Sequence, residues 1–138
     1  MKAIVVARSF IVRKRKVLLI KRAPYDIHNP GLWECPGGKL DDGEDLFSGR
    51  QREIRQETGL LVESLSPVMC VASYVIRDGR HTGMTYICTF DVAKFMKGKI
   101  ELSDEHDDYA WVSYRKMFSY NLTEEAKKAA EVLSEYLF

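Results

Sequence analysis

The stretch from residue 38 to residue 60 constrains the fold more than any other part of the chain. Residues 45–58 contain no proline and many good helix formers, and Gly59 stands where a helix would end in the left-handed conformation. The preceding residues 23–43 are rich in proline and glycine, which interrupt regular structure. The sequence therefore predicts a helix over residues 45–58 after a long loop, and long ordered loops in compact domains are usually functional.

The rest of the chain has the composition of strands and one closing helix. Segments rich in Val, Ile, Leu and aromatic residues predict strands at residues 3–12, 17–21, 61–76, 84–90 and 109–112. The basic tetrad 13–16 and the Asp-Gly pair at residues 78–79 are expected to form hairpin turns. Thr123 is expected to cap a final helix over residues 123–137. Strands before and after a helix in mixed order predict an α/β or α+β sandwich, with one domain over residues 1–138.

The charge balance argues against a large nucleic-acid footprint. The chain has 21 Lys and Arg against 20 Asp and Glu, whereas nucleic-acid-binding domains are usually strongly basic. The tetrad 13–16 is interpreted as a solvated hairpin tip, with contact to an RNA backbone as the alternative. No apolar run approaches the roughly 20 residues of a membrane span. The 3 cysteines lack paired or zinc-binding spacing, so we expect free thiols and a reducing, cytoplasmic location.

Three oxygen-bearing side chains share one face of the predicted helix. Because each residue turns by about 100°, Glu53, Gln56 and Glu57 fall within an arc of about 100°. Carboxylates gathered in this way repel one another unless a cation lies between them, and oxygen ligands favour Mg²⁺ or Mn²⁺. The alternative is a solvated acidic surface. Gly49 lies on the same stripe, where it either allows close approach of the glycine loop or is simply tolerated.

The spacing of these residues resembles a known family motif. The frame is Gly38, five residues, Glu44, seven residues, Arg52-Glu53-Ile54, one residue, Gln56-Glu57, one residue and Gly59-Leu60. It is similar to the Nudix box, G-x5-E-x7-R-E-U-x-E-E-x-G-U with U an aliphatic residue, and departs from it only where Gln56 replaces a glutamate. Residues 18–23 and 31–39 also look like the lead-in of MutT-like members, and residues 105–112 like a later acidic loop and Trp strand. The resemblance implies a Nudix-type α/β/α sandwich with a central mixed β-sheet.

The resemblance also implies metal ligands. In the family, the helix glutamates bind metal ions together with a backbone carbonyl of the glycine loop, which points here to Glu53, Glu57 and either Gly37 or Gly38. Gln56 keeps a carbonyl oxygen that can bind a metal, but it lacks the charge of the usual glutamate. We therefore expect fewer or more loosely held ions, with Mg²⁺ as the metal and Mn²⁺ as a second possibility.

Catalytic roles follow from the same comparison. Arg52 is expected to orient a carboxylate through a charge-assisted hydrogen bond, with Glu44 as its partner. Glu53 and Glu105 are the candidates for activating water, because family members differ in which acid does this. An ordinary polar loop acid is the alternative for Glu105, and His106 is interpreted as a loop or edge residue.

Three residues are candidates for substrate contacts. Arg22, at the end of a predicted strand, is placed to meet a phosphate, and a surface cation is the alternative. Tyr74 is a candidate for base stacking, although strand aromatics usually pack in the core. Asn121 precedes the last helix, where some MutT-like members read the base with an Asn, and helix capping is its alternative.

The predicted reaction is cleavage of the diphosphate linkage of a nucleoside triphosphate or a related nucleoside diphosphate derivative, including modified or oxidised forms, to a monophosphate and pyrophosphate. Two alternatives stand beside it: a nucleotide-binding module with weak catalysis because of Gln56, and a hydrolase of dinucleoside polyphosphates or capped RNA ends. The expected partner is a small nucleotide, with no stable nucleic-acid partner and no membrane. The chain is expected to be a monomer or a homodimer.

Overall fold

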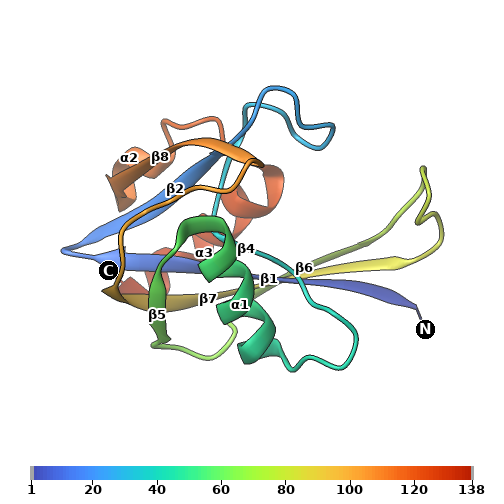
Figure 1. The fold of residues 1–138 in the computed structure, drawn as a ribbon, viewed down its shortest axis with the longest axis horizontal. Helices are drawn as coiled ribbons and strands as arrows, with labels where there is room; N and C mark the ends of the chain where they lie inside the picture. The colour runs from blue at the N-terminus through green and yellow to red at the C-terminus, as the bar shows by residue number, and fades with distance from the viewer. Residues whose placement is uncertain (1, 138) are drawn as a thin grey trace.

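The long strand β1 (Ala3–Arg13) organises the sheet in the computed structural model, which describes residues 2–137. On one edge β1 pairs in parallel with β7 (Thr85–Lys97) through a continuous register of ten residue pairs. On its other edge it pairs antiparallel with β4 (Gly37–Lys39) and, near the hairpin turn, with β2 (Lys16–Arg22). Because β1 is bonded along both edges, it holds the glycine-containing β4 at the centre of the sheet (Figure 1).

Four shorter strands complete the sheet, and all of them pair antiparallel. Two lie on β7 and two on β2; they are β5 (Leu61–Ser64), β6 (Cys70–Val75), β3 (Trp33–Glu34) and β8 (His106–Ser113). One parallel pair among antiparallel ones makes the eight-stranded sheet mixed. The central mixed sheet predicted from the sequence is confirmed.

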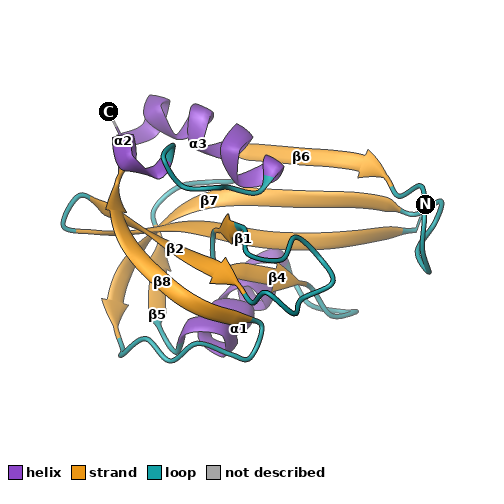
Figure 2. Ribbon diagram, turned by 90° about the horizontal axis from the view of Figure 1, so that it is seen from above, coloured by secondary structure: helices purple, strands orange, loops and turns teal. Residues whose placement is uncertain are grey.

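Helices cover both faces of this sheet. One face carries α1 (Leu46–Thr58), and the opposite face carries α2 (Tyr114–Met117) and α3 (Glu124–Leu137) (Figure 2). The predicted α/β/α sandwich is therefore confirmed. Within residues 2–137, no helix has the length and apolar character needed to cross a membrane.

The two cores follow from the alternation of side chains along the strands. Adjacent strand residues point to opposite faces. Phe10 and Leu19 accordingly join the buried cluster under α3, whereas Ile11 and Leu18 join the cluster that contains Ile54 of α1. All five side chains are fully buried, so α1 has a fixed position relative to the sheet.

Local signals set the ends of the helices. Asp45 caps α1, since its carboxylate accepts a hydrogen bond from the Ser48 N–H (2.9 Å), and Gly59 ends the helix in the left-handed conformation with φ of 77°. The Thr123 hydroxyl accepts from the Ala126 N–H (3.2 Å) at the start of α3. Both predicted helices are confirmed to within one residue at each end.

Both predicted hairpins are also present. Lys14 and Arg15 have positive φ, 50° and 64°, as a two-residue turn that matches strand twist requires. The second hairpin is closed by the Ile76 N–H, which donates to the Met84 carbonyl (2.9 Å).

The prediction of one strand over residues 61–76 is wrong, because the structure has two. Pro67 lies between β5 and β6, and proline cannot donate to a sheet ladder. The two strands pair with different parts of β7, which extends to Lys97 instead of ending at residue 90. Strand β8 starts at His106, earlier than the predicted 109–112, because an edge strand tolerates charged residues that hide the strand pattern.

A buried ion pair fastens α1 to the sheet. The Arg50 guanidinium lies 2.8 Å from the Asp91 carboxylate of β7, and both side chains are almost fully buried. Asp91 also accepts hydrogen bonds from the hydroxyls of Ser9 and Ser64. A buried charge of this kind is tolerated only because it is paired and hydrogen-bonded.

We predict that Asp91→Asn lowers the free energy of unfolding by about 3–5 kcal/mol, because it leaves the buried Arg50 charge without a counter-charge. Urea denaturation followed by circular dichroism measures the change. Asp107→Asn is the matched control, since Asp107 is exposed on β8. Equal stability of the two variants would show that the buried pair does not hold α1 in place.

Candidate active site

The glycine loop brings the sheet backbone into contact with α1. Gly37 lies opposite Arg8 of β1, and a Cβ at Gly37 would lie 2.1 Å from the Ala7 carbonyl oxygen. Its φ of 141° also disfavours any other residue. The Gly37 N–H donates to a carboxylate oxygen of Glu57 (2.9 Å), so the sheet backbone directly positions a side chain of α1.

Glu57 is the carboxyl group of the box whose pKa is raised most. Its residue surface is 6% exposed, and this burial raises its pKa to about 7. The positive charge of Arg8 and the hydrogen bond from Gly37 oppose the shift but do not cancel it. A group held in this way binds a cation readily, because a positive charge would replace the lost solvation.

Glu53 lies against the second glycine of the loop. A Cβ at Gly38 would lie 2.4 Å from a carboxylate oxygen of Glu53, so the close contact requires glycine. Burial raises the pKa of Glu53, and the negative charge of Glu105 raises it further against the opposing effect of Arg52. Gly49 has a similar steric role, since a Cβ there would lie 2.2 Å from Leu40, which confirms the close approach of the loop.

Arg52 links four acceptors at the rim of the site. Two of its nitrogens reach the two oxygens of Glu44, at 2.7 and 2.8 Å, so the predicted contact is present in bidentate form. A third nitrogen lies 3.1 Å from both the Glu53 carboxylate and the Gln56 amide oxygen. The amide oxygen of Gln56 is therefore turned toward Arg52, and the Gln56 side chain is exposed. The Lys39 carbonyl accepts a hydrogen bond (3.2 Å) from the nitrogen that reaches Glu44 at 2.8 Å.

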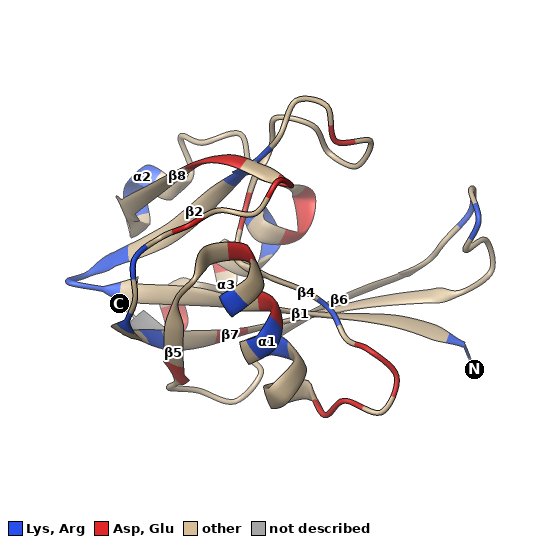
Figure 3. Cartoon of the chain, viewed as in Figure 1, with Lys and Arg blue, Asp and Glu red and all other residues tan. Residues whose placement is uncertain are grey.

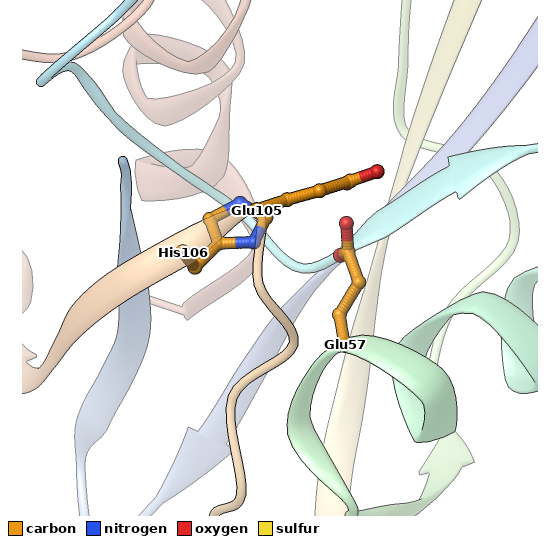
Figure 4. A group of neighbouring side chains, drawn as sticks. All are labelled: Glu57, Glu105 and His106. Atoms are coloured by element: carbon orange, nitrogen blue, oxygen red, sulfur yellow. The ribbon is translucent and has the colours of Figure 1, made fainter. Parts of the chain in front are cut away.

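The loop before β8 carries Glu105 to the same place. Oxygen or nitrogen ligand atoms of Glu57, Glu105 and His106 all lie within 4.8 Å of one another (Figure 4). The loop is held by hydrogen bonds from the Ser103 N–H to the Glu57 carbonyl (3.2 Å) and from the Ala23 N–H to the Glu105 carbonyl (2.9 Å). Figure 3 shows the acidic residues of α1, of the loop after β4 and of this loop.

A buried charge network lies behind this cluster. Glu34 of β3 is contacted by Arg8 (3.5 Å), Arg22 (2.9 Å) and His106 (2.8 Å). Burial alone would raise the pKa of Glu34, but these partners, Arg8 foremost, lower it to about 2. Sequence reasoning missed Glu34, Arg8 and His106. An acid between Trp33 and Cys35 was the available signal, since a buried carboxylate needs a cationic partner.

The proposed substrate residues are more scattered. Arg22 is partly buried and is paired with Asp26 (2.8 Å) as well as Glu34, so it is not a free surface cation. Tyr74 is 53% exposed on β6 and stacks on Tyr86 with ring centroids 4.9 Å apart, so it lies outside the core. Asn121 is exposed, and Thr123 rather than Asn121 caps α3.

The donor set fits a divalent cation. Glu53, Glu57 and Glu105 supply carboxylates from α1 and the loop before β8, and hard oxygen ligands suit Mg²⁺ and similar ions. Burial is the main cause of the raised pKa values of Glu53 and Glu57, so their carboxylates have lost solvation that the neighbouring positive groups replace only in part. A bound cation would supply further positive charge.

These features define the class: an α/β/α sandwich in which a helix that carries two glutamates packs against a glycine loop. The family model described as "NUDIX domain" matches residues 3–136. The chain belongs to the Nudix family, whose hydrolases act on phosphoric anhydride bonds and generally use a divalent metal.

Individual relatives agree with this assignment. Nucleoside triphosphatase NudI of Escherichia coli O17:K52:H18 is 30% identical over 72% of this chain and 74% of its own length. Nudix hydrolase 7 of Arabidopsis thaliana is 23% identical over 97% of the chain, which spans only 50% of that relative. The structure of a MutT Nudix hydrolase from Burkholderia pseudomallei has a TM-score of 0.78 and 25% identity, covering 96% of this chain and 99% of that one.

We predict that the two loop glycines fail in different ways when replaced by alanine. Gly37→Ala puts a Cβ against backbone in a left-handed conformation, so it should cost roughly 1–3 kcal/mol of stability. Gly38→Ala meets only the flexible end of Glu53, so it should keep the fold and weaken Mn²⁺ binding by about tenfold. Urea denaturation and titration calorimetry measure the two effects. Unchanged Mn²⁺ affinity in Gly38→Ala would refute the role given to this contact.

We predict that stability without metal falls as pH rises from 5 to 8. Burial raises the pKa of Glu57 in the folded state to about 7, above its ordinary value, so the folded protein holds a proton that the unfolded chain releases. That stabilisation is present at low pH and is lost as pH rises through about 7. Denaturation in EDTA across this range should show the decline, and Glu57→Gln should reduce it; an identical pH profile for both proteins would contradict the prediction.

Proposed function

We propose that this protein is a metal-dependent pyrophosphohydrolase that cleaves a nucleoside triphosphate, including modified or oxidised forms, to a monophosphate and pyrophosphate. The observation that carries the proposal is that Glu53 and Glu57 lie against the glycine loop and that Glu105 lies beside Glu57. The similarity to the E. coli protein named nucleoside triphosphatase supports the substrate class. In the reaction, water adds across one phosphoric anhydride bond, so no oxidant or further reactant is needed.

The residues of the box have distinct proposed roles. Glu53 and Glu57, with a carbonyl of Gly37 or Gly38, would hold Mg²⁺ or Mn²⁺, and Gln56 would contribute at most a weak ligand. The metal supplies positive charge that neutralises the phosphates and favours ionisation of water. Both loop carbonyls stay candidates: the one of Gly37 accepts a long hydrogen bond from Arg8 (3.4 Å), and Gly38 is paired with Ala7 in the ladder of β1 and β4.

Positioning and proton transfer involve the residues around this pair. Arg52 fixes Glu53 through one nitrogen and Glu44 through two others, which limits the rotation of the Glu53 carboxylate. Glu53 or Glu105 would accept the proton of the attacking water, and burial, by raising the pKa of Glu53, makes the Glu53 carboxylate a stronger base.

Substrate contacts are proposed for three residues outside the box. Arg22 would bind a phosphate in place of Asp26 and would keep its ion pair with Glu34. Tyr74 presents an exposed aromatic ring and Asn121 an exposed amide, which are suited to stacking on a base and to reading its edge.

We also propose a single catalytic domain over residues 1–138, since one sheet includes both the first strand, β1, and the last, β8. The buried, unpaired thiols of Cys35 and Cys88 support a reducing compartment, and we propose the cytoplasm. The proposed partner is a small nucleotide, bound by a monomer or a homodimer.

We predict that the protein releases pyrophosphate from at least one nucleoside triphosphate in Mg²⁺ or Mn²⁺, and none in EDTA. A panel of standard, oxidised and methylated nucleoside triphosphates, with dinucleoside polyphosphates and capped RNA alongside, identifies the substrate. Glu53→Gln should lower kcat by about 10²–10⁴-fold, since it removes a charge from the metal and water site. Glu63→Gln, an exposed change on β5, is the control. Binding of nucleotides without turnover of any of them would identify a binding module instead.

A further inference from the structure

His106 is buried beside the acidic cluster with one ring nitrogen unsatisfied. The residue is 4% exposed and begins β8 directly after Glu105. Its Nε2 lies 2.8 Å from the Glu34 carboxylate. Its Nδ1 has no hydrogen-bond partner among residues 2–137. A buried polar atom without a partner is costly, so the vacant position of Nδ1 requires an explanation.

The partners of Glu34 determine which nitrogen carries the proton. Glu34 forms ion pairs with Arg8 (3.5 Å) and Arg22 (2.9 Å) and is therefore a carboxylate, which can only accept hydrogen bonds. Nε2 must then be the protonated nitrogen that donates to Glu34. In neutral imidazole the other nitrogen, Nδ1, holds a lone pair and is free to bind a metal.

The surroundings of His106 supply the other ligands. Ligand atoms of Glu57, Glu105 and His106 lie within 4.8 Å of one another, and the imidazole lies beside the Glu57 carboxylate (Figure 4). Metal-binding histidines usually donate their second ring nitrogen to a carboxylate, which sets the tautomer and the orientation of the ring. Glu34 is the carboxylate that accepts the hydrogen bond from the second ring nitrogen of His106.

We propose that Glu57, Glu105 and His106 form a mixed nitrogen and oxygen site for a divalent transition-metal ion, with Nδ1 of His106 as a ligand and Glu34 as its orienting group. An imidazole ligand suits borderline ions such as Fe²⁺, Co²⁺ and Zn²⁺ better than Mg²⁺, and Mn²⁺, although it favours oxygen ligands, accepts an imidazole more readily than Mg²⁺ does. The proposal rests on the proposed function for the location of the metal and extends it to metal preference: this enzyme selects a transition ion at one position of its site.

The test is pulsed electron paramagnetic resonance of the full chain loaded with substoichiometric Mn²⁺. A nitrogen bound directly to Mn²⁺ modulates the electron spin echo, and ¹⁵N labelling of histidine shifts that modulation, which assigns it to imidazole. The chain has 3 histidines. The double variant His28→Gln/His81→Gln leaves His106 alone, and it should keep the nitrogen signal of the wild type.

His106→Gln is the complementary variant. Its amide nitrogen can still donate to Glu34 from the position of Nε2, while the imidazole ligand is gone. The nitrogen signal should disappear, and the Kd for Mn²⁺ should rise by about tenfold or more, with a change of less than about threefold for Mg²⁺. Circular dichroism of metal-free His106→Gln tests whether this variant is folded. If it is unfolded, the nitrogen signal of the double variant still assigns the ligand to His106.

The outcomes separate this inference from the proposed function. Absence of a histidine nitrogen signal from Mn²⁺-loaded wild type, absence of Mn²⁺ binding, or loss of the signal in the double variant overturns the inference, even if nucleotides are hydrolysed. Equal weakening of Mn²⁺ and Mg²⁺ in His106→Gln overturns the metal preference. A His106 nitrogen signal in a protein that hydrolyses no nucleotide keeps the inference and rejects the proposed function.

Discussion

The active site depends on the hydrogen bond from the Gly37 backbone to the Glu57 carboxylate (2.9 Å). A Cβ at position 37 would overlap the Ala7 carbonyl of β1, so glycine is needed there for β4 to lie against β1 and present its N–H to Glu57. Gly38 and Gly49 provide the same clearance for Glu53 and Leu40. Gly37 therefore allows the close approach of β4 to β1, and Gly38 and Gly49 allow the close approach of the glycine loop to α1. These approaches bring the Glu53 and Glu57 carboxylates together.

Charges buried beneath the site keep this arrangement in place. Asp91 and Arg50 fix the position of α1 on the sheet, and Glu34 links Arg8 of β1, Arg22 of β2 and His106 of β8. A buried charge without its partner is strongly destabilising, so these contacts specify one relative position of the strands. Glu57 remains the exception, because burial raises its pKa while its partners compensate only in part. The imbalance is the physical basis for binding a cation there.

The sequence predicts the helices, the hairpins and the sandwich because their signals are local: Asp45 and Gly59 mark the ends of α1, and the spacing of the box places its acids on one face. It does not predict the pairing of Glu34 with His106, because 72 residues separate them and their contact depends on how β2 aligns β3 with β8. The break in the strand over residues 61–76 was signalled by Pro67 but obscured by β-rich residues on both sides.

The central claim is that the glycine loop, α1 and the loop before β8 together bind a divalent cation. The most direct measurement is nuclear magnetic resonance of ¹⁵N-labelled protein titrated with Mn²⁺, which broadens the amide signals of nearby residues. The account predicts that signals of Gly38, Glu57 and Glu105 disappear first, while those of Lys14 and Gly79 at the two hairpin tips persist. Broadening centred away from the glycine loop, or none at all, would contradict the account.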